Sequence, residues 1–289
     1  MKHFVFINSF ENDAVKSLLY AIKFTKYSNA TLHIMHLVRS DLGPFLLTSS
    51  LYLVSDQSQR YLEGLNQSQI KSINKIKAKI LSIAGEDLPV NWRIHRFNKE
   101  ELLEGIYSMF NEIDVELILI GNYLAAQISN RKTLEMLINE TDIPILLIPS
   151  FQEFASIRKI LFLSEYLMED LKHIEIIKSL FVNKKCELDI VHFPKDRDDD
   201  EPEKNFVKKT LLSLEKKDSK RTKINVKEIT EKVAIEKYLD LEFSGFVNEN
   251  DFLCLSTKKR GFLEVIISKN TSLKFAKKMI VPVLLFRKS

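Results

Sequence analysis

The stretch ELILIGNYLAAQISNRKTLEML, residues 116–137, places a short apolar strand, one glycine, a polar loop and a helical segment in direct succession. This order is typical of α/β folds, in which the loop between a strand and a helix often holds phosphate. After Gly121, the next glycine in the chain is Gly245. The stretch therefore predicts an α/β fold and raises the question of whether its loop still binds a nucleotide.

The composition predicts a globular protein with packed cores, because 45% of the 289 residues are hydrophobic and 10% are aromatic. No apolar run approaches the roughly 20 residues that a membrane-spanning helix needs, and acidic residues follow the first strand too early for a signal peptide. We therefore expect a cytoplasmic protein with no membrane partner. The net charge of +4 is modest for a nucleic-acid-binding protein, so no nucleic-acid partner is expected.

Ten strand-like segments divide equally between the two halves of the chain. Those of the first half lie at 3–10, 30–38, 90–97, 115–122 and 143–149, and those of the second half lie at 159–166, 186–193, 224–230, 250–257 and 281–286. Stretches with helical periodicity, such as residues 12–27, lie between them. Strands that alternate with helices favour parallel sheets joined by right-handed crossovers.

The second half repeats the first. The strands that begin at residues 4 and 30 recur 156 residues later, at 160 and 186, whereas the fourth and fifth strands recur after 135 and 138 residues. A repeat of about half the chain predicts two copies of one domain, residues 1–150 and 157–289, rather than a solenoid. The last strand of each copy is expected at a sheet edge. Because bare apolar edges promote aggregation, we expect residues 143–148 to pair with residues 281–286.

With these features the sequence resembles a tandem universal stress protein over nearly all of both halves. The resemblance is carried by an opening strand that ends in Phe or Tyr, a long first helix, the A-x-L-x-x-x-H strand at 30–36 and the I-P-I-L-L-I-P strand at 143–149. It implies two tandem flavodoxin-like, or Rossmann-like, doubly wound α/β domains. Each would hold a five-stranded parallel sheet of order 3-2-1-4-5, associate through its fifth strand and serve in the stress response.

Nucleotide-binding members of that family carry G-x2-G-x9-G-[S/T] after the fourth strand, where glycines let backbone N–H groups approach phosphate. Gly121 matches the first glycine, but Leu124 replaces the second, and Arg131 and Lys132 replace the final pair. In the second half the same places hold Ser256, Lys259, Lys269 and Asn270. Both pockets are therefore expected to be degenerate.

The adenine end of the expected pocket has changed as well. Ser9 stands where ATP-binding members have an aspartate, and Glu165 takes that place in the second copy. The resemblance assigns the vestigial nucleotide site of the first domain to Ser9, Leu37, Gly121, Asn122, Arg131 and Lys132. We expect no cofactor. The alternative is that the first domain binds ATP, AMP or another anion weakly, with Arg131 and Lys132 acting through their side chains instead of forming a solvated helix end.

Other reactive side chains have structural interpretations. Cys186 and Cys254 lie in apolar strand-like runs, where thiols usually pack as small buried groups. His33 and His36 point to opposite faces of a strand, so we expect no metal site. His36 and its counterpart His192 are expected to pack beneath a loop or to bond to the backbone. No catalytic constellation is evident, and we expect no enzymatic activity.

Two further segments bear on partners. Residues 256–275 combine apolar and basic side chains after a strand, and we expect them to fold over the second pocket. Residues 40–71 carry many apolar side chains that would either cap the first domain or contact a second chain. The sequence thus predicts a non-catalytic protein that binds a protein partner of unknown identity and that could form homodimers.

Overall fold

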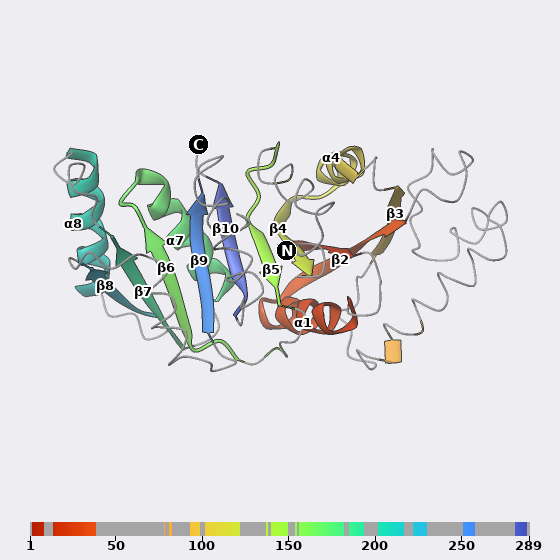
Figure 1. Ribbon diagram of the computed structural model, residues 1–289, viewed down its shortest axis with the longest axis horizontal. Helices are drawn as coiled ribbons and strands as arrows, with labels where there is room; N and C mark the ends of the chain where they lie inside the picture. Colours follow the sequence, from red (N-terminus) through yellow and green to blue (C-terminus); the bar gives the residue numbers. More distant parts are fainter. Residues whose placement is uncertain are drawn as a thin grey trace, which may run out of the picture. The chain divides into compact units, whose positions relative to one another are not determined.

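The computed structural model describes residues 2–8, 14–38, 78, 81–82, 93–98, 102–121, 137, 140–149, 154, 156–181, 185–193, 202–216, 222–229, 251–257 and 281–287 (Figure 1). The chain forms two compact units. Unit 1 comprises Met1–Leu137 and Ile148–Glu153, and unit 2 comprises Ile138–Leu147 and Phe154–Ser289. Each strand that the structure describes overlaps one of the ten predicted strand segments. Among the described residues, no helix has the length and apolarity needed to cross a membrane.

Unit 1 contains four parallel strands in the order β3-β2-β1-β4. The strands are β1 (Lys2–Asn8), β2 (Ala30–Val38), β3 (Arg93–Asn98) and β4 (Val115–Gly121), and the helices are α1 (Ala14–Tyr27) and α4 (Leu102–Glu112). Helix α1 packs on the sheet through Phe24, whose ring stacks on Phe4 with centroids 5.9 Å apart. The helix gives way to β2 at Asn29, whose φ of 53° is the left-handed turn that commonly ends a helix.

Unit 2 holds the strands in the order β5-β10-β9-β6-β7-β8. The strands are β5 (Ile145–Ile148), β6 (Lys159–Ser164), β7 (Cys186–His192), β8 (Thr222–Glu228), β9 (Asp251–Thr257) and β10 (Val283–Arg287), and the helices are α7 (Met168–Leu180) and α8 (Pro202–Lys216). All described pairings in this unit are parallel except that between β5 and β10. The protein is therefore an α/β fold with a mostly parallel arrangement of strands.

The two units repeat the same strand register. Asn8 of β1 pairs with His36 of β2, and 156 residues later Ser164 of β6 pairs with His192 of β7. In the same way Phe4 pairs with Leu117, and Ile160 pairs with Phe252. These pairs differ by the offsets of 156 and 135 residues that the sequence displays, so residues of the two units can be matched one to one along these strands.

Strand β5 does not stay with the half of the chain that encodes it. Its residues Ile145–Leu147 cluster with unit 2, where Leu146 lies opposite Leu284 of β10 in an antiparallel pair. The predicted pairing of residues 143–148 with residues 281–286 is present. The observed unit boundary thus differs from the predicted boundary at residue 150 by this strand. The physical reason is that the pairing buries two apolar edges, since Leu146 and Leu284 are both 0% exposed.

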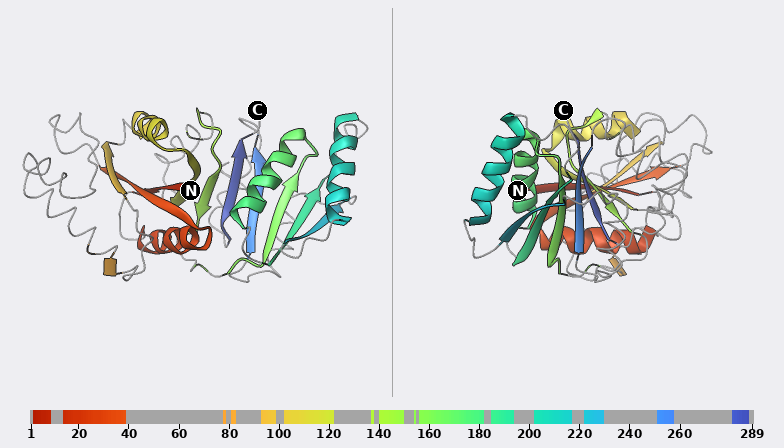
Figure 2. Two further views of the ribbon diagram at one scale, coloured as in Figure 1. Left: turned by 180° about the vertical axis from the view of Figure 1, so that it is seen from behind. Right: turned by 60° about the vertical axis from the view of Figure 1, so that its left-hand side comes forward.

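Helices α7 and α8 cover one face of the unit 2 sheet (Figure 2). Phe162 of β6 contacts His173 of α7, and Glu228 of β8 pairs with Lys208 of α8 at 2.7 Å. Even-numbered side chains of β6, β7 and β8 face these helices, because side chains alternate along each strand. This arrangement brings the start of α7 against the carboxyl ends of β6 and β9, where the candidate site lies.

Candidate functional site

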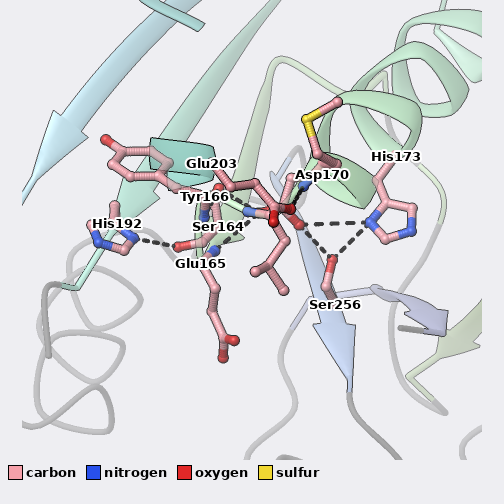
Figure 3. Close-up of polar contacts among 10 residues, drawn as sticks. Ser164, Glu165, Tyr166, Asp170, His173, His192, Glu203 and Ser256 are labelled. Carbon is pink, nitrogen blue, oxygen red and sulfur yellow. Dashed lines mark hydrogen bonds and ion pairs between the residues drawn. The ribbon is translucent and has the colours of Figure 1, made fainter. Parts of the chain in front are cut away.

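The strand order of unit 2 places a topological switch point between β6 and β9. From β6 the chain moves outward through β7 and β8, and β9 then pairs on the other side of β6. Ligands of open α/β sheets bind outside the carboxyl ends of the strands at such a point. In this protein the position is filled by four buried side chains, which we call the polar cluster: Ser164, Asp170, His173 and Ser256 (Figure 3).

Asp170 is the centre of the polar cluster and is 0% exposed. Its Oδ2 accepts hydrogen bonds from Ser164 Oγ at 2.7 Å, from the Glu165 amide at 3.0 Å and from the Leu167 amide at 3.2 Å. Its Oδ1 accepts a bond from Ser256 Oγ at 3.2 Å. The carboxylate thus binds amide groups at the start of α7, which are the groups that would otherwise attract an external anion.

His173 extends the polar cluster toward β10. Its Nδ1 lies 2.8 Å from Ser256 Oγ and 3.8 Å from Asp170 Oδ1, and its ring stacks on Phe286 with centroids 4.4 Å apart. Because a hydroxyl has a single proton, Ser256 can donate to Asp170 only while His173 Nδ1 donates to Ser256. A catalytic triad instead joins the serine and the aspartate to different nitrogens of the histidine. The polar cluster therefore contains the residue types of a triad without its geometry.

An aromatic pair lies beside the polar cluster, across the ends of β6 and β7. The rings of Tyr166 and His192 stack with centroids 3.9 Å apart and 16° between their planes. His192 Nδ1 lies 2.9 Å from the carbonyl oxygen of Ser164, which confirms the prediction that His192 bonds to the backbone. Both rings are buried, with exposed fractions of 3% and 4%.

The matching positions of unit 1 carry much smaller side chains. The offsets of 156 and 135 residues align Asp170 with Ala14, His173 with Ser17 and Ser256 with Gly121. Gly121 ends β4 and is buried, and a Cβ placed on it would lie 3.0 Å from both Cβ and Oγ of Ser17. Close packing of α1 on β4 is therefore sufficient to explain this glycine. The Ser17 side chain is 1% exposed, and its hydroxyl has no hydrogen-bond partner among the described residues.

The predicted nucleotide site of the first domain falls largely outside the described residues. Ser9, Asn122, Arg131 and Lys132 are in that category, as are residues 258–275 and the insertion at 40–71. Leu37 lies in β2, opposite Phe97 of β3. Gly121 ends β4, where it packs against Ser17.

The cysteines and histidines behave as packed side chains. Cys186 and Cys254 are free and buried, as predicted. Burial raises the pKa of the Cys186 thiol and raises that of Cys254 well above 9.0, so the reactive thiolates are disfavoured. His33 is 2% exposed and its Nε2 lies 3.0 Å from His3 Nδ1. No group of three His, Cys, Asp or Glu side chains within the described parts of the chain could hold a metal ion.

Sequence analysis missed Asp170, His173 and Tyr166. Ser256 and Asp170 are separated by 86 residues, and only the pairing of β6 with β9 brings them together. A signal was nevertheless present in the repeat. Aligning the halves by their offsets sets small residues of the first half against larger polar ones of the second at the strand ends, which marks where the two sites differ.

The fold is that of universal stress proteins. The chain matches the structure of a universal stress protein from Archaeoglobus fulgidus DSM 4304 with a TM-score of 0.59 and 11% identity, over 99% of this chain and 98% of that chain. It also matches a putative universal stress protein from Pseudomonas aeruginosa UCBPP-PA14 (TM-score 0.47, 12% identity, 99% and 93% coverage) and a functionally unknown protein from Pseudomonas aeruginosa PAO1 (0.46, 11%, 99% and 92%). No protein-family model matches the sequence, and no curated protein matches it.

Proposed function

We propose that this chain is a tandem, non-catalytic, cytoplasmic stress-response protein of the universal stress type, which binds a protein partner and whose nucleotide pockets are degenerate. The observation that carries the proposal is the buried carboxylate of Asp170 at the switch point of unit 2. An internal anion already holds the amides at the start of α7, and a phosphate group placed there would meet an uncompensated like charge.

The tandem organisation is supported by the repeated register of β1 with β2 and of β6 with β7. A non-catalytic role is supported by the geometry of the polar cluster, in which Ser256 and Asp170 share one nitrogen of His173. Partner binding is supported by the sequence of residues 40–71, whose apolar side chains are typical of an interface.

The second candidate function is an anion or nucleotide sensor that uses unit 1. It is favoured by the replacement of Asp170 by Ala14, because no carboxylate at this position competes for an anion at the start of α1. In this case Arg131 and Lys132 would hold ATP, AMP or another anion by their side chains, and binding would change the surface that unit 1 offers to its partner.

Thermal unfolding with ATP, AMP, a cyclic nucleotide and inorganic phosphate separates the two candidates. A ligand at about 100 times its dissociation constant stabilises the native state by about 2.7 kcal/mol. We expect no change in melting temperature with any of the four, because both pockets have lost the features that hold phosphate.

A rise in melting temperature with ATP or AMP would contradict the first proposal. If the rise disappeared in Arg131→Ala and persisted in Lys209→Ala, the sensor function would replace it. Lys209 is the matched control because it removes the same charge from an exposed position on α8.

A further inference from the structure

The ring of Tyr166 closes the carboxyl ends of β6 and β7 in unit 2. The residue follows β6 by two positions, its side chain is 3% exposed, and its ring lies flat on the ring of His192 (Figure 3). His192 is in turn held in place by its contact with the carbonyl of Ser164. A protein side chain therefore occupies the kind of position, above the strand ends, where α/β sheets receive small molecules.

The backbone of Tyr166 has a conformation that is rare for a residue with a side chain. Its φ is 58°, in the left-handed region that non-glycine residues seldom adopt unless their surroundings impose it. The Tyr166 amide donates to Ser164 Oγ at 3.1 Å, and that hydroxyl donates to Asp170 at 2.7 Å. The polar cluster thus holds the strained residue, and with it the ring, over His192.

We propose that Tyr166 is the resident occupant of a latent site for a small planar aromatic molecule, whose floor is the His192 ring. Stacked aromatic rings at this separation attract one another through their faces, so an external ring on His192 would replace the contact that Tyr166 makes. The neighbouring Asp170 carboxylate restricts the ligand to a neutral or cationic aromatic compound. The first half of the sequence repeats the same two residue types as Phe10 and His36, at the offset of 156 residues.

The proposal deepens the proposed function and rests on it in one respect, namely that unit 2 takes no phosphate group. It is tested with Tyr166→Gly, because glycine adopts the left-handed backbone readily and its lack of a ring leaves a space of the size of phenol. Apolar cavities of this kind take up aromatic molecules. Phenol, indole and adenosine are the probes, and thermal unfolding of the full chain is the measurement.

We expect phenol or indole to stabilise Tyr166→Gly and to leave the wild type unchanged. At about ten times its dissociation constant, the probe should raise the melting temperature of the variant by roughly 3 °C. Tyr166→Phe is the matched control, because it keeps the ring and should not respond. Adding His192→Ala to Tyr166→Gly removes the stacking partner and should weaken phenol binding by about tenfold.

Three outcomes would overturn the proposal. The first is a folded Tyr166→Gly that none of the probes stabilises, and the second is an equal response of the wild type, which would place binding elsewhere. Tyr166→Asn, which also tolerates the left-handed backbone, serves as a second variant. If both variants stayed unfolded even with phenol present, Tyr166 would be a core residue and not an occupant. A nucleotide response of the wild type would instead contradict the proposed function and leave this test unaffected.

Discussion

At the scale of single residues, the two units solve the same packing problem in different ways. Where α1 meets the end of β4, Gly121 leaves room for Ser17 and the contact is one of close packing. At the matching place in unit 2, Ser256 and His173 are joined by a hydrogen bond of 2.8 Å. Larger polar side chains are tolerated there because they bond to one another and to Asp170. A glycine at this position is therefore no evidence of phosphate binding by itself.

The contact between Gly121 and Ser17 makes opposite predictions for two substitutions. Gly121→Ala should lower the free energy of unfolding by about 1–3 kcal/mol, because the added Cβ meets Ser17 at 3.0 Å. Ser17→Ala should raise it by about 1 kcal/mol, because the buried hydroxyl it removes has no partner among the described residues. Urea unfolding of each variant measures both effects.

The double variant is the control for this pair. Removing Ser17 Oγ relieves one of the two close contacts of the new Cβ, so the two effects should be coupled and the double variant more stable than their sum implies. A Gly121→Ala variant as stable as the wild type would show that the packing explanation is wrong. In that case the glycine would need another reason, and phosphate binding would regain weight.

At the scale of elements, the three strands β6, β7 and β8 carry a polar network on the face turned away from α7 and α8. Asp189 of β7 is 3% exposed and accepts hydrogen bonds from Asn225 at 2.6 Å and from Lys227 at 2.9 Å, both on β8. Lys159 of β6 lies 3.3 Å from the same carboxylate. Burial alone would raise the pKa of Asp189, but the bonds from Asn225 and Lys227 and the two lysine charges outweigh it and lower the pKa below 3.8.

This lowered pKa predicts how the stability of unit 2 depends on pH. Because the folded pKa lies below the ordinary value of 3.8, the native state binds the proton less readily than the unfolded chain. The stabilisation is therefore present above that value and is lost as the pH falls through it toward the folded pKa. Asp189→Asn should lower the free energy of unfolding at neutral pH by about 1–3 kcal/mol.

Urea unfolding between about pH 2 and pH 7 checks this prediction. The gap between the wild type and Asp189→Asn should be constant at neutral pH and should close in the acid range. A gap that stays the same at every pH would mean that the charge of Asp189 makes no net contribution. The variant is its own control, since an amide of the same shape does not titrate.

The sequence predicted the elements better than the site. Each strand could be found from a short apolar run, such as residues 115–121 and 143–148, because continuous apolar runs mark strands that are covered on both faces. The polar cluster could not be found in this way. Ser256 and Asp170 meet only through the pairing of β6 with β9, and nothing in their local sequence indicates that contact. The stacking of Tyr166 on His192 likewise depends on a left-handed backbone that its neighbours impose.

At the scale of the whole molecule, the principal feature is the strand that changes units. Residues 138–147 belong to unit 2 although they precede the linker, and Ile148–Glu153 belong to unit 1. The edge argument from the sequence predicted the pairing of β5 with β10. It could not predict which unit would claim the strand, because that depends on how many contacts each side supplies. The ion pair of Arg287 with Asp142 at 3.0 Å adds a polar contact at the end of this pairing.

Charge placed in the pairing of β5 with β10 should destabilise the protein strongly. Leu284→Lys or Leu146→Lys buries an unpaired ammonium group at a position that is 0% exposed, at a cost of more than about 4 kcal/mol. We expect the variants to expose strand edges, to aggregate in size-exclusion chromatography and to be cleaved faster in limited proteolysis. Leu81→Lys, at a side chain that is 45% exposed, should behave as the wild type. Variants of Leu146 and Leu284 with unchanged size and protease resistance would disprove the role of this pairing.

The position of β5 also sets an order of events during synthesis. Leu146 leaves the ribosome early, yet its partner Leu284 is among the last residues to be made. Until translation ends, the apolar strand must wait without its neighbour, and contacts between such distant segments form slowly. A nascent chain of this protein thus carries a sticky segment for nearly half of its elongation, which is the period in which a chaperone would bind it most readily.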